Sequence, residues 1–298
     1  MIWLGVIWLS AACRADFTVA VLPIATPTTS AVISPPRATL SDPTPMINFP
    51  TPAPQATPTV PPTPSPITLT LVYDNRSFDA RLTTDWGLAS VIEDGPTTVL
   101  FDTGGTGAIL LDNLRLLEVE VRRIDAIVLS HSHRDHTDGL SALLAAITPT
   151  LYAPSAVLRI LPRSVRDRVR LIDTDQPTAI TARLQTTGVL GASIPEQALI
   201  IKTAQGLSVI TGCAHPGIVE IVRQARQWGP IDLIVGGFHL LDASPTQVAN
   251  VIEELQALGV RRVAPTHCTG EPTIAQFRAA FADNFIEAGA GAVIVLAP

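Results

Sequence analysis

The stretch SHSHRDH, at residues 130–136, decides what this sequence folds into and what chemistry it supports. It directly follows the apolar run AIVL at 126–129, which predicts a buried strand, and it precedes TDG at 137–139, where a helix is expected to begin. Three imidazoles and a carboxylate at the end of a buried strand would cost a large desolvation free energy unless they bound a cation. The stretch therefore predicts a metal site, in preference to a surface histidine cluster or a polar turn.

The spacing within this stretch divides the donors between two ions. Alternate side chains of an extended segment share a face, so His131 and His133 point to the same side. The turn that follows brings Asp135 and His136 toward a second metal position. We therefore expect two metal ions side by side.

The sequence contains six histidines, and the other three are His215, His239 and His267. Each of them also comes directly after an apolar run typical of a strand. Functional side chains gather on the loops that leave one edge of a sheet. The histidine positions therefore predict one metal-binding edge to which four strand ends contribute.

Residues 67–298 alternate short apolar runs with amphipathic segments, a pattern typical of α/β layers. Strands are expected at 67–73, 88–93, 98–101, 126–129, 198–202, 207–210, 232–235, 262–264 and 292–296. Helices are expected at 108–117, 139–147, 218–228, 245–258 and 273–282. We recognise no motif in the stretch 152–191, where substrate-selecting loops are expected.

The motif HSHRDH at 131–136 resembles the signature of the metallo-β-lactamase superfamily. The turn FDTG at 101–104 and the pair TH at 266–267 match further motifs of that superfamily. A narrower resemblance is visible in TGCAHPGI at 211–218 and GGFHL at 236–240, with HCTG at 267–270. Together these motifs are similar to the group labelled dihydropterin synthase-like, whose activity is broadly defined.

The resemblance implies that residues 67–298 form a catalytic domain with a four-layer αββα sandwich and two metals at one edge of the paired sheets. It implies zinc in the first place, with manganese or iron as alternatives. By position, the first metal would be held by His131, His133 and His215, and the second by Asp135, His136 and His267.

For several residues near these motifs the sequence allows both a functional and a purely structural role. Many superfamily members have a bridging Asp where this chain has Cys213, so that thiol either ligates a metal or packs beside it. His239 is a ligand, a substrate contact or a proton donor, or else a structural histidine. Asp102 is expected to fix the tautomer of a metal-bound histidine, with a surface turn as the alternative. Cys268 is a buried thiol with or without a function, and a disulfide to Cys213 is conceivable.

The resemblance implies a hydrolase that uses a metal-activated water on an ester, lactone or phosphodiester bond of a small molecule. Asp135 would accept a proton from that water, and His239 or a metal-bound water would protonate the leaving group. One alternative is a dihydropterin-related synthase that forms a C–N or C–C bond. The other is a tethered module that binds a metal or ligand without turnover.

The N-terminal part is expected to place the domain outside the cytoplasm. Residues 1–22 read as a leader that resembles a bacterial lipoprotein signal, with Cys13 as the lipid-bearing residue. Plain secretion, a membrane-tethered form and a cytoplasmic location are the alternatives. Between residues 23 and 66 lie 14 of the 26 prolines, so this segment is expected to be an extended linker without a packed core.

The charge distribution makes nucleic acid an unexpected partner. The formal net charge is -6, and acidic and basic residues are interspersed. No block of positive charge is present to neutralise a phosphate backbone. The expected partners are a small-molecule substrate and, through the leader, a membrane.

Overall fold

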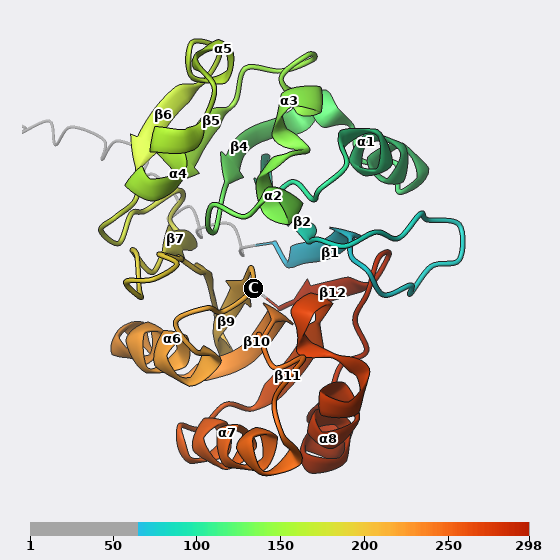
Figure 1. Ribbon diagram of the computed structural model, residues 1–298, viewed down its shortest axis with the longest axis vertical. Coiled ribbons are helices and arrows are strands. Elements are labelled where there is room, and N and C mark those ends of the chain that lie inside the picture. Colours follow the sequence, from blue (N-terminus) through green and yellow to red (C-terminus); the bar gives the residue numbers. More distant parts are fainter. Residues whose placement is uncertain (1–64, 298) are drawn as a thin grey trace, which may run out of the picture. The chain divides into compact units, whose positions relative to one another are not determined.

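The computed structural model describes residues 65–297, which contain two β-sheets flanked by helices (Figure 1). The predicted leader at 1–22, with Cys13, and residues 23–64 of the predicted linker lie outside the described residues. The first sheet has the strand order β12 (Val293–Leu296), β1 (Ile67–Tyr73), β2 (Ala89–Asp94), β3 (Thr97–Phe101), β4 (Ile124–Val128), β5 (Thr150–Ala153), β6 (Arg170–Asp173). The second has the order β11 (Arg262–Thr266), β10 (Ile231–Gly237), β9 (Gly206–Thr211), β8 (Leu199–Thr203), β7 (Leu184–Thr186).

The helices divide between the two outer faces. Those beside the first sheet are α1 (Gly107–Leu116), α2 (Arg134–Thr137), α3 (Leu140–Leu143), α4 (Ser155–Ile160) and α5 (Arg163–Arg166). Those beside the second sheet are α6 (Ile218–Ala225), α7 (Pro245–Ala257) and α8 (Glu271–Phe281). Short 3-10 turns lie at Val121–Arg123, Arg226–Trp228, His267–Thr269 and Ala282–Asn284.

The two sheets stack because every second side chain of their strands is apolar and faces the other sheet. In β1, Ile67, Leu69 and Leu71 are fully buried and belong to the same core cluster as Leu199 and Ile201 of β8. Successive side chains of a strand point to opposite faces, so these alternate positions fill the space between the two sheets. Full burial of each such side chain stabilises the fold by about 1.5–3 kcal/mol.

The opposite faces of the sheets pack against helices. Ile200 of β8 lies in a second core cluster with Ile221 of α6 and Phe277 of α8. A third core cluster joins Leu110 of α1 and Ile127 of β4 with other residues of the first sheet and its helices. Three apolar clusters therefore separate four layers, and the predicted αββα fold is confirmed.

The strand directions bring the predicted metal ligands to one edge. Strands β3 and β4 are parallel neighbours, and so are β9, β10 and β11. The carboxyl ends of parallel neighbours meet at the same edge of a sheet, and the metal-type side chains follow β4, β9, β10 and β11 directly.

Two parts of the chain differ from the sequence expectations. The helix predicted at 139–147 is α-helical only at Leu140–Leu143, because Ala145 and Ala146 donate to carbonyls three residues back and tighten the chain before Pro149. The stretch 150–191 contains β5, β6, β7, α4 and α5, none of which was predicted, because their three to six residues are too few to show a period in the sequence.

Among the described residues, none of the helices is long and apolar enough to cross a membrane.

Candidate metal centre

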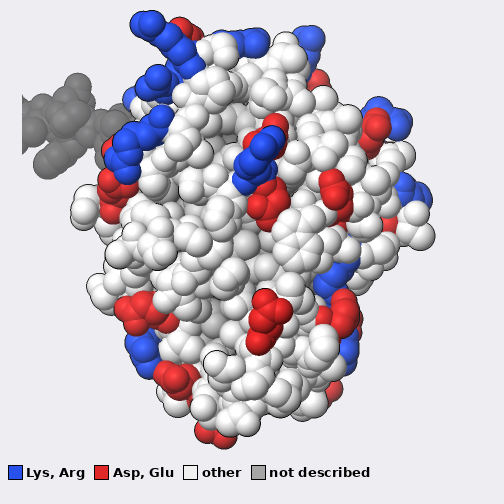
Figure 2. Space-filling model, viewed as in Figure 1, with Lys and Arg blue, Asp and Glu red and all other residues white. Residues whose placement is uncertain are grey.

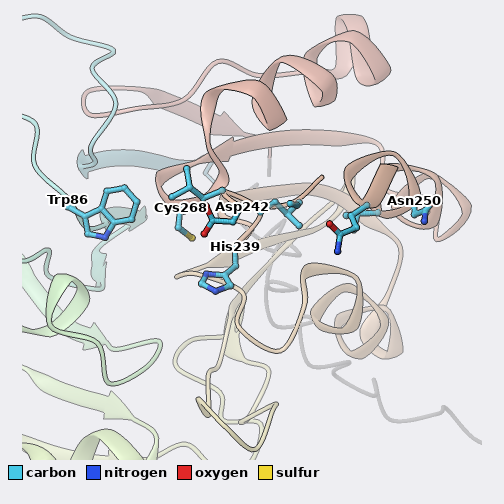
Figure 3. A pocket seen from close by; sticks show the side chains of 10 residues that line it. Trp86, His239, Asp242, Asn250 and Cys268 are labelled. Carbon is cyan, nitrogen blue, oxygen red and sulfur yellow. The ribbon is translucent and has the colours of Figure 1, made fainter. Parts of the chain in front are cut away.

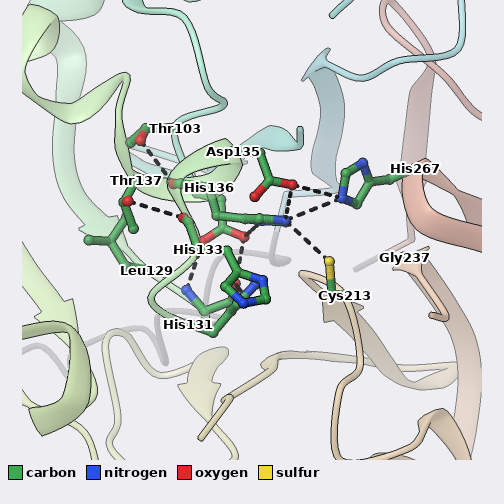
Figure 4. A network of polar contacts seen from close by, with 12 residues as sticks. Thr103, Leu129, His131, His133, Asp135, His136, Thr137, Cys213, Gly237 and His267 are labelled. Carbon is green, nitrogen blue, oxygen red and sulfur yellow. Dashed lines mark hydrogen bonds and ion pairs between the residues drawn. The ribbon is translucent and has the colours of Figure 1, made fainter. Parts of the chain in front are cut away.

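Asp135, His136 and His267, which we call the second cluster, bring three donor atoms close together (Figure 4). Nε2 of His136 lies 3.3 Å from Nε2 of His267, and Oδ2 of Asp135 lies 3.4 Å from each of these nitrogens. Sγ of Cys213 lies 3.3 Å from Nε2 of His136. Three metal-type donors therefore converge on one position, and the thiol of Cys213, whose role the sequence left open, lies beside His136.

These separations fit metal coordination better than hydrogen bonding. Donors at 2.0–2.1 Å from a tetrahedral zinc ion lie about 3.3–3.4 Å from one another. An N–H···O hydrogen bond is most often about 2.9–3.0 Å long, so the contacts of Asp135 are long for that interaction. The geometry of the second cluster is that of a ligand shell.

The second nitrogen of each histidine in this cluster is held from behind. Nδ1 of His136 lies 2.7 Å from Oδ2 of Asp102, and Nδ1 of His267 lies 2.8 Å from Oδ1 of Asn75. Asp102 is completely buried, and it also accepts hydrogen bonds from the backbone N–H and the hydroxyl of Ser130. Such contacts fix the tautomer and the ring orientation, which leaves Nε2 free to bind a metal.

His131, His133 and His215, which we call the first cluster, lie beside the second one. Their ring centroids are 4.8 Å apart for His131 and His133, 4.6 Å for His131 and His215, and 4.7 Å for His133 and His215. Nδ1 of His131 lies 2.8 Å from the hydroxyl of Ser130, whereas its buried Nε2 has no hydrogen-bond partner. A buried nitrogen without a partner is costly unless a ligand satisfies it. This cluster also fits a metal.

Glu196 is a second functional residue, besides Asn75, that the sequence analysis missed. Its fully buried carboxylate accepts hydrogen bonds from the backbone N–H groups of Cys213, Ala214 and His215, and Oε2 lies 2.8 Å from Nδ1 of His215. Glu196 thereby shapes the loop after β9 and orients a histidine of the first cluster. Nothing in the sequence around Glu196 marks it, because its partners lie 17 to 19 residues away.

The pKa values of buried histidines shift in opposite directions in the two clusters. Burial alone would lower the pKa of His136, but the carboxylates of Asp102 and Asp135 raise it to about 10. Burial acts to raise the pKa of Asp135, yet contacts with His136 and His267 hold it well below its ordinary range. In the first cluster, burial lowers the pKa of His131 well below its usual value. His131 therefore offers a neutral imidazole, whereas His136, held between two carboxylates, releases a proton when its Nε2 binds a metal.

Glu196 remains ionised over a wide pH range. Burial acts to raise its pKa, but the hydrogen bonds from His215 and from the loop backbone, together with the nearby His131 ring, lower the pKa to about 2. A permanent negative charge therefore lies behind the first cluster.

Left-handed backbone conformations concentrate at this edge. Asp102, Ala214, His239 and His267 have φ values of 57°, 63°, 52° and 50°. Non-glycine residues adopt this region at a cost of about 1–3 kcal/mol, and they do so mainly where the surrounding structure fixes a functional side chain. The local strain is therefore consistent with a functional site.

Cys213 lies between the two clusters. Its Sγ belongs to one group of donor atoms with His131 and His215 and to another with His136 and His267, and within each group all atoms lie within 4.8 Å of one another. Its thiol is thus near both expected metal positions, at the place where the resemblance gives many superfamily members a bridging Asp. In the described part of the chain Cys213 and Cys268 are both free and buried, so the conceivable disulfide is not formed.

His239 lies at the mouth of a cavity of about 600 Å³ next to the clusters (Figure 3). Its ring centroid is 4.4 Å from that of His215. The cavity is lined by Trp86, His239, Leu240, Leu241, Asp242, Ala243, Gln247, Asn250, Val251 and Cys268. The lining contains neither Lys nor Arg, so it offers an apolar and weakly acidic surface to a substrate.

The structure thus brings all six histidines into one group, with Asp102 and Asp135 among them. The rings of His131 and His136 are 4.3 Å apart, and those of His136 and His267 are 5.0 Å apart. These contacts connect the two clusters, and the rings of His215 and His239 extend the group to the cavity.

This fold and these donors define a class of protein. The chain belongs to the β-lactamase superfamily, because residues 97–268 match the family described as Beta-lactamase superfamily domain. The resemblance stated from the histidine motifs is confirmed.

The narrower resemblance also has a counterpart among known proteins. The chain is 26% identical over 278 residues to the 7,8-dihydropterin-6-methyl-4-(β-D-ribofuranosyl)-aminobenzene-5'-phosphate synthase of Methanocaldococcus jannaschii. The match covers 76% of this chain and 95% of that protein.

Solved structures share the fold at lower identity. Tm1679, described as a metal-dependent hydrolase of the β-lactamase superfamily, is 24% identical with a TM-score of 0.67 and covers 78% of this chain and 100% of its own. The metallo-β-lactamase fold protein YhfI from Bacillus subtilis is 17% identical with a TM-score of 0.58, covering 78% and 99%. The short form of human tRNase Z is 16% identical with a TM-score of 0.54, covering 76% and 98%.

Proposed function

We propose that this chain is a hydrolase that uses two divalent metal ions to cleave an ester, lactone or phosphodiester bond of a small molecule. The observation that carries the proposal is the convergence of Asp135, His136 and His267 at 3.3–3.4 Å, beside the unpartnered Nε2 of His131. Zinc suits the histidine, carboxylate and thiol donors best, with manganese and iron as alternatives.

The two clusters would hold one ion each. Two ions bound there supply a water of lowered pKa and polarise the carbonyl or phosphoryl oxygen of the substrate. In this proposal Cys213 contributes a sulfur ligand on the side of the second cluster, 3.3 Å from Nε2 of His136. Asp102, Asn75 and Glu196 orient the histidines.

The protein side chains would move the protons. Asp135 is partly exposed, and its pKa lies well below its ordinary range, so it is ionised and oriented to accept a hydrogen from the attacking water. His239 is exposed at the cavity, and its pKa is raised by contact with Cys268 against the effect of burial. His239 is therefore placed to donate a proton to the leaving group.

The substrate would lie in the cavity between Trp86 and the loop after β10. Trp86 is 46% exposed and Leu241 is 51% exposed, so both offer apolar contact area. On the face shown in Figure 2, basic side chains gather mainly over α5 and β6, and the middle of the face is largely uncharged. These features favour a substrate whose non-reacting part is apolar.

The variant Asp135→Asn tests the proton-transfer role. We expect turnover to fall by about 100- to 10,000-fold, the usual contribution of a general base. Asp138→Asn is the matched control, because Asp138 lies on the same short stretch but pairs with Arg134 at the surface. Turnover should be measured on a panel of esters, lactones and phosphodiesters, with the metal content of each variant determined in parallel. Unchanged turnover in Asp135→Asn with metal retained would remove Asp135 from the mechanism.

A dihydropterin-related synthase is the second candidate function. It is favoured by one observation, the 26% identity to the methanogen synthase over 95% of that protein. A synthase would join two substrates, and mass spectrometry would detect the adduct, whereas a hydrolase would yield two products from one substrate. A module that binds metal without turnover would do neither.

We also propose that the leader and the linker tether the domain outside the cytoplasm, with lipid on Cys13. The support is the apolar segment that ends in small residues before Cys13, together with 14 prolines between residues 23 and 66. In a bacterial host, Cys13→Ala should move the protein from the membrane fraction to the soluble fraction. Equal amounts in the membrane fraction for both proteins would contradict lipid attachment.

A further inference from the structure

A third group of metal-type donors lies beside the two clusters. It consists of Sγ of Cys213, Sγ of Cys268 and a ring nitrogen of His239, and these atoms all lie within 4.8 Å of one another. We call this group the thiol triad. Two of its members, Cys268 and His239, belong to neither cluster.

The fold places the thiol triad on three neighbouring strand ends. Cys213 follows β9, His239 follows β10 and Cys268 follows β11. These strands are parallel and adjacent, with Gly236 paired to Thr211 and Gly237 paired to Thr266. The triad is therefore a product of strand order and register, which is why no short sequence motif reveals it.

Gly237 makes the room in which the thiols meet. A Cβ at this position would lie 2.7 Å from Sγ of Cys268 and 3.2 Å from Cα of Cys213. The first distance, and a still shorter one to the carbonyl oxygen of Gly212, are shorter than real Cβ contacts, so any larger residue would displace a thiol or the backbone beside it. His239 adopts the left-handed φ of 52°, which is a further local strain at the triad.

The donors of the triad suit a soft metal ion. Both cysteines are only 4% exposed, so the sulfurs are shielded from solvent, whereas His239 is exposed at the cavity. Thiolate ligands select copper(I) and zinc over hard cations, and copper(I) accepts few ligands. Two thiolates bound at about 2.3 Å to one ion lie about 3.8–4.0 Å apart, a separation within the 4.8 Å that bounds the distances between these donors.

We propose that Cys213, Cys268 and His239 form a binding site for one copper(I) ion, distinct from the sites of the two clusters. In the zinc-loaded chain Cys213 is already a thiolate, so copper binding releases only the thiol proton of Cys268 to solvent; two copper–sulfur bonds and one copper–nitrogen bond form, with no change of oxidation state. Cys213 is shared with the second cluster, so its sulfur lies between the zinc and the copper positions. A bound copper ion occupies His239, and for that reason it inhibits the proposed hydrolysis.

The experiment uses the full chain loaded with zinc, under anaerobic conditions. Copper(I) is added in competition with a chromophoric copper(I) chelator, and the zinc content is followed at each step. We expect one equivalent of copper to bind while the zinc content remains constant. Zinc loss in step with copper uptake would mean that copper had entered the clusters, and this result would overturn the proposal.

Variants separate the triad from other thiols. Cys268→Ser should weaken copper binding by more than about 100-fold, since even changes outside the ligand shell of a metal cost 10–100-fold. Cys13→Ser is the matched control, because Cys13 is the one other cysteine of the sequence, and it should bind copper as the parent does. Loss of binding in Cys13→Ser with full binding in Cys268→Ser would overturn the proposal.

A second variant guards against misfolding of Cys268→Ser. His239 is exposed, so His239→Gln should leave the fold intact while weakening copper binding by at least about tenfold. Unaltered copper affinity in His239→Gln would overturn the three-donor site. The inhibition by copper rests on the proposed hydrolase function, whereas the binding measurement does not, so the two fail separately.

Discussion

The first and second clusters lie side by side but are built from different parts. The second cluster combines Asp135 with two histidines and has the buried Asp102 behind it, whereas the first has three imidazoles and only Glu196 behind His215. The donors of the second cluster already lie at the separations of a ligand shell. Two carboxylates near the ion attract a divalent cation more strongly than neutral imidazoles do. The second cluster is therefore expected to hold its metal more tightly.

His136→Ala should have the largest effect, because His136 is fully buried and contacts Asp102, Asp135, His267 and Cys213. Its removal opens the second cluster, and the metal content should fall to one equivalent per chain with turnover reduced by more than about 100-fold. His133→Ala is the comparison, since His133 is partly exposed at the edge of the first cluster. Metal analysis and steady-state kinetics check both variants. Equal losses in the two would remove the difference between the clusters.

Asp102→Asn and Glu196→Gln should each weaken the cluster that they support. We expect metal affinity to fall by about 10- to 100-fold, at the second cluster for Asp102→Asn and at the first for Glu196→Gln. Glu196→Gln should also lower the free energy of unfolding by about 2 kcal/mol, because its charged acceptor holds three backbone N–H groups. Competition with a chelator measures the affinities, and chemical denaturation measures the stability. A reversed assignment of the two losses would contradict the geometry.

Asp74 lies beneath the second cluster and should make stability depend on pH. Burial raises its pKa from 3.8 to about 6, while Thr266, next to His267, donates a hydrogen bond to Oδ2. Between these two pH values the folded chain keeps a proton that the unfolded chain has lost, so the contribution of Asp74 to stability falls as pH rises through this range. The change is on the order of 3 kcal/mol. Asp74→Asn should remove it.

The measurement is the free energy of unfolding at pH 4 and pH 7 for the parent and for Asp74→Asn. The parent should lose stability relative to the variant as the pH rises. An identical pH dependence in the two proteins would show that Asp74 is not buried as described.

Ser244→Ala should have the smallest effect and leave both clusters unchanged. The Ser244 hydroxyl accepts a hydrogen bond from the backbone N–H of Gln247 at the start of α7, and the side-chain oxygen of Gln247 accepts one from the backbone N–H of Ser244. Loss of this cap should cost about 1 kcal/mol of stability. Thermal unfolding and metal analysis check the two parts of this prediction. A change in metal content would show that α7 is coupled to the centre.

The metal ligands could be predicted from the sequence more readily than the residues that orient them. Asp135 and His136 belong to a contiguous motif whose local spacing already predicts shared metal positions. The role of Glu196 depends on residues 17 to 19 positions away that only the folded sheet brings to it. Ligands that lie close together in the chain can be recognised from the sequence. The residues that orient them, such as Glu196, are brought near by strand order and register, which the sequence does not show.

Long strands with many apolar residues could also be predicted more reliably than short or exposed ones. Strand β1, whose sequence alternates apolar residues with threonine from Ile67 to Leu71, was predicted at its observed bounds. Strand β7 has three residues and β6 is mostly exposed, so neither carries enough apolar signal to be distinguished from a loop. The helix predicted at 139–147 was too long, because the apolar spacing of the sequence continues through turns that are no longer α-helical after α3.

The two-metal centre is tested most directly by the number of metal ions per chain, measured by native mass spectrometry while a chelator is added in steps. We predict two equivalents in the purified protein after metal supplementation. We further predict that one ion leaves first and that the ion retained longer is lost early in Asp102→Asn. One equivalent or none after supplementation would contradict the two-metal centre, and the binding-module alternative would then take its place.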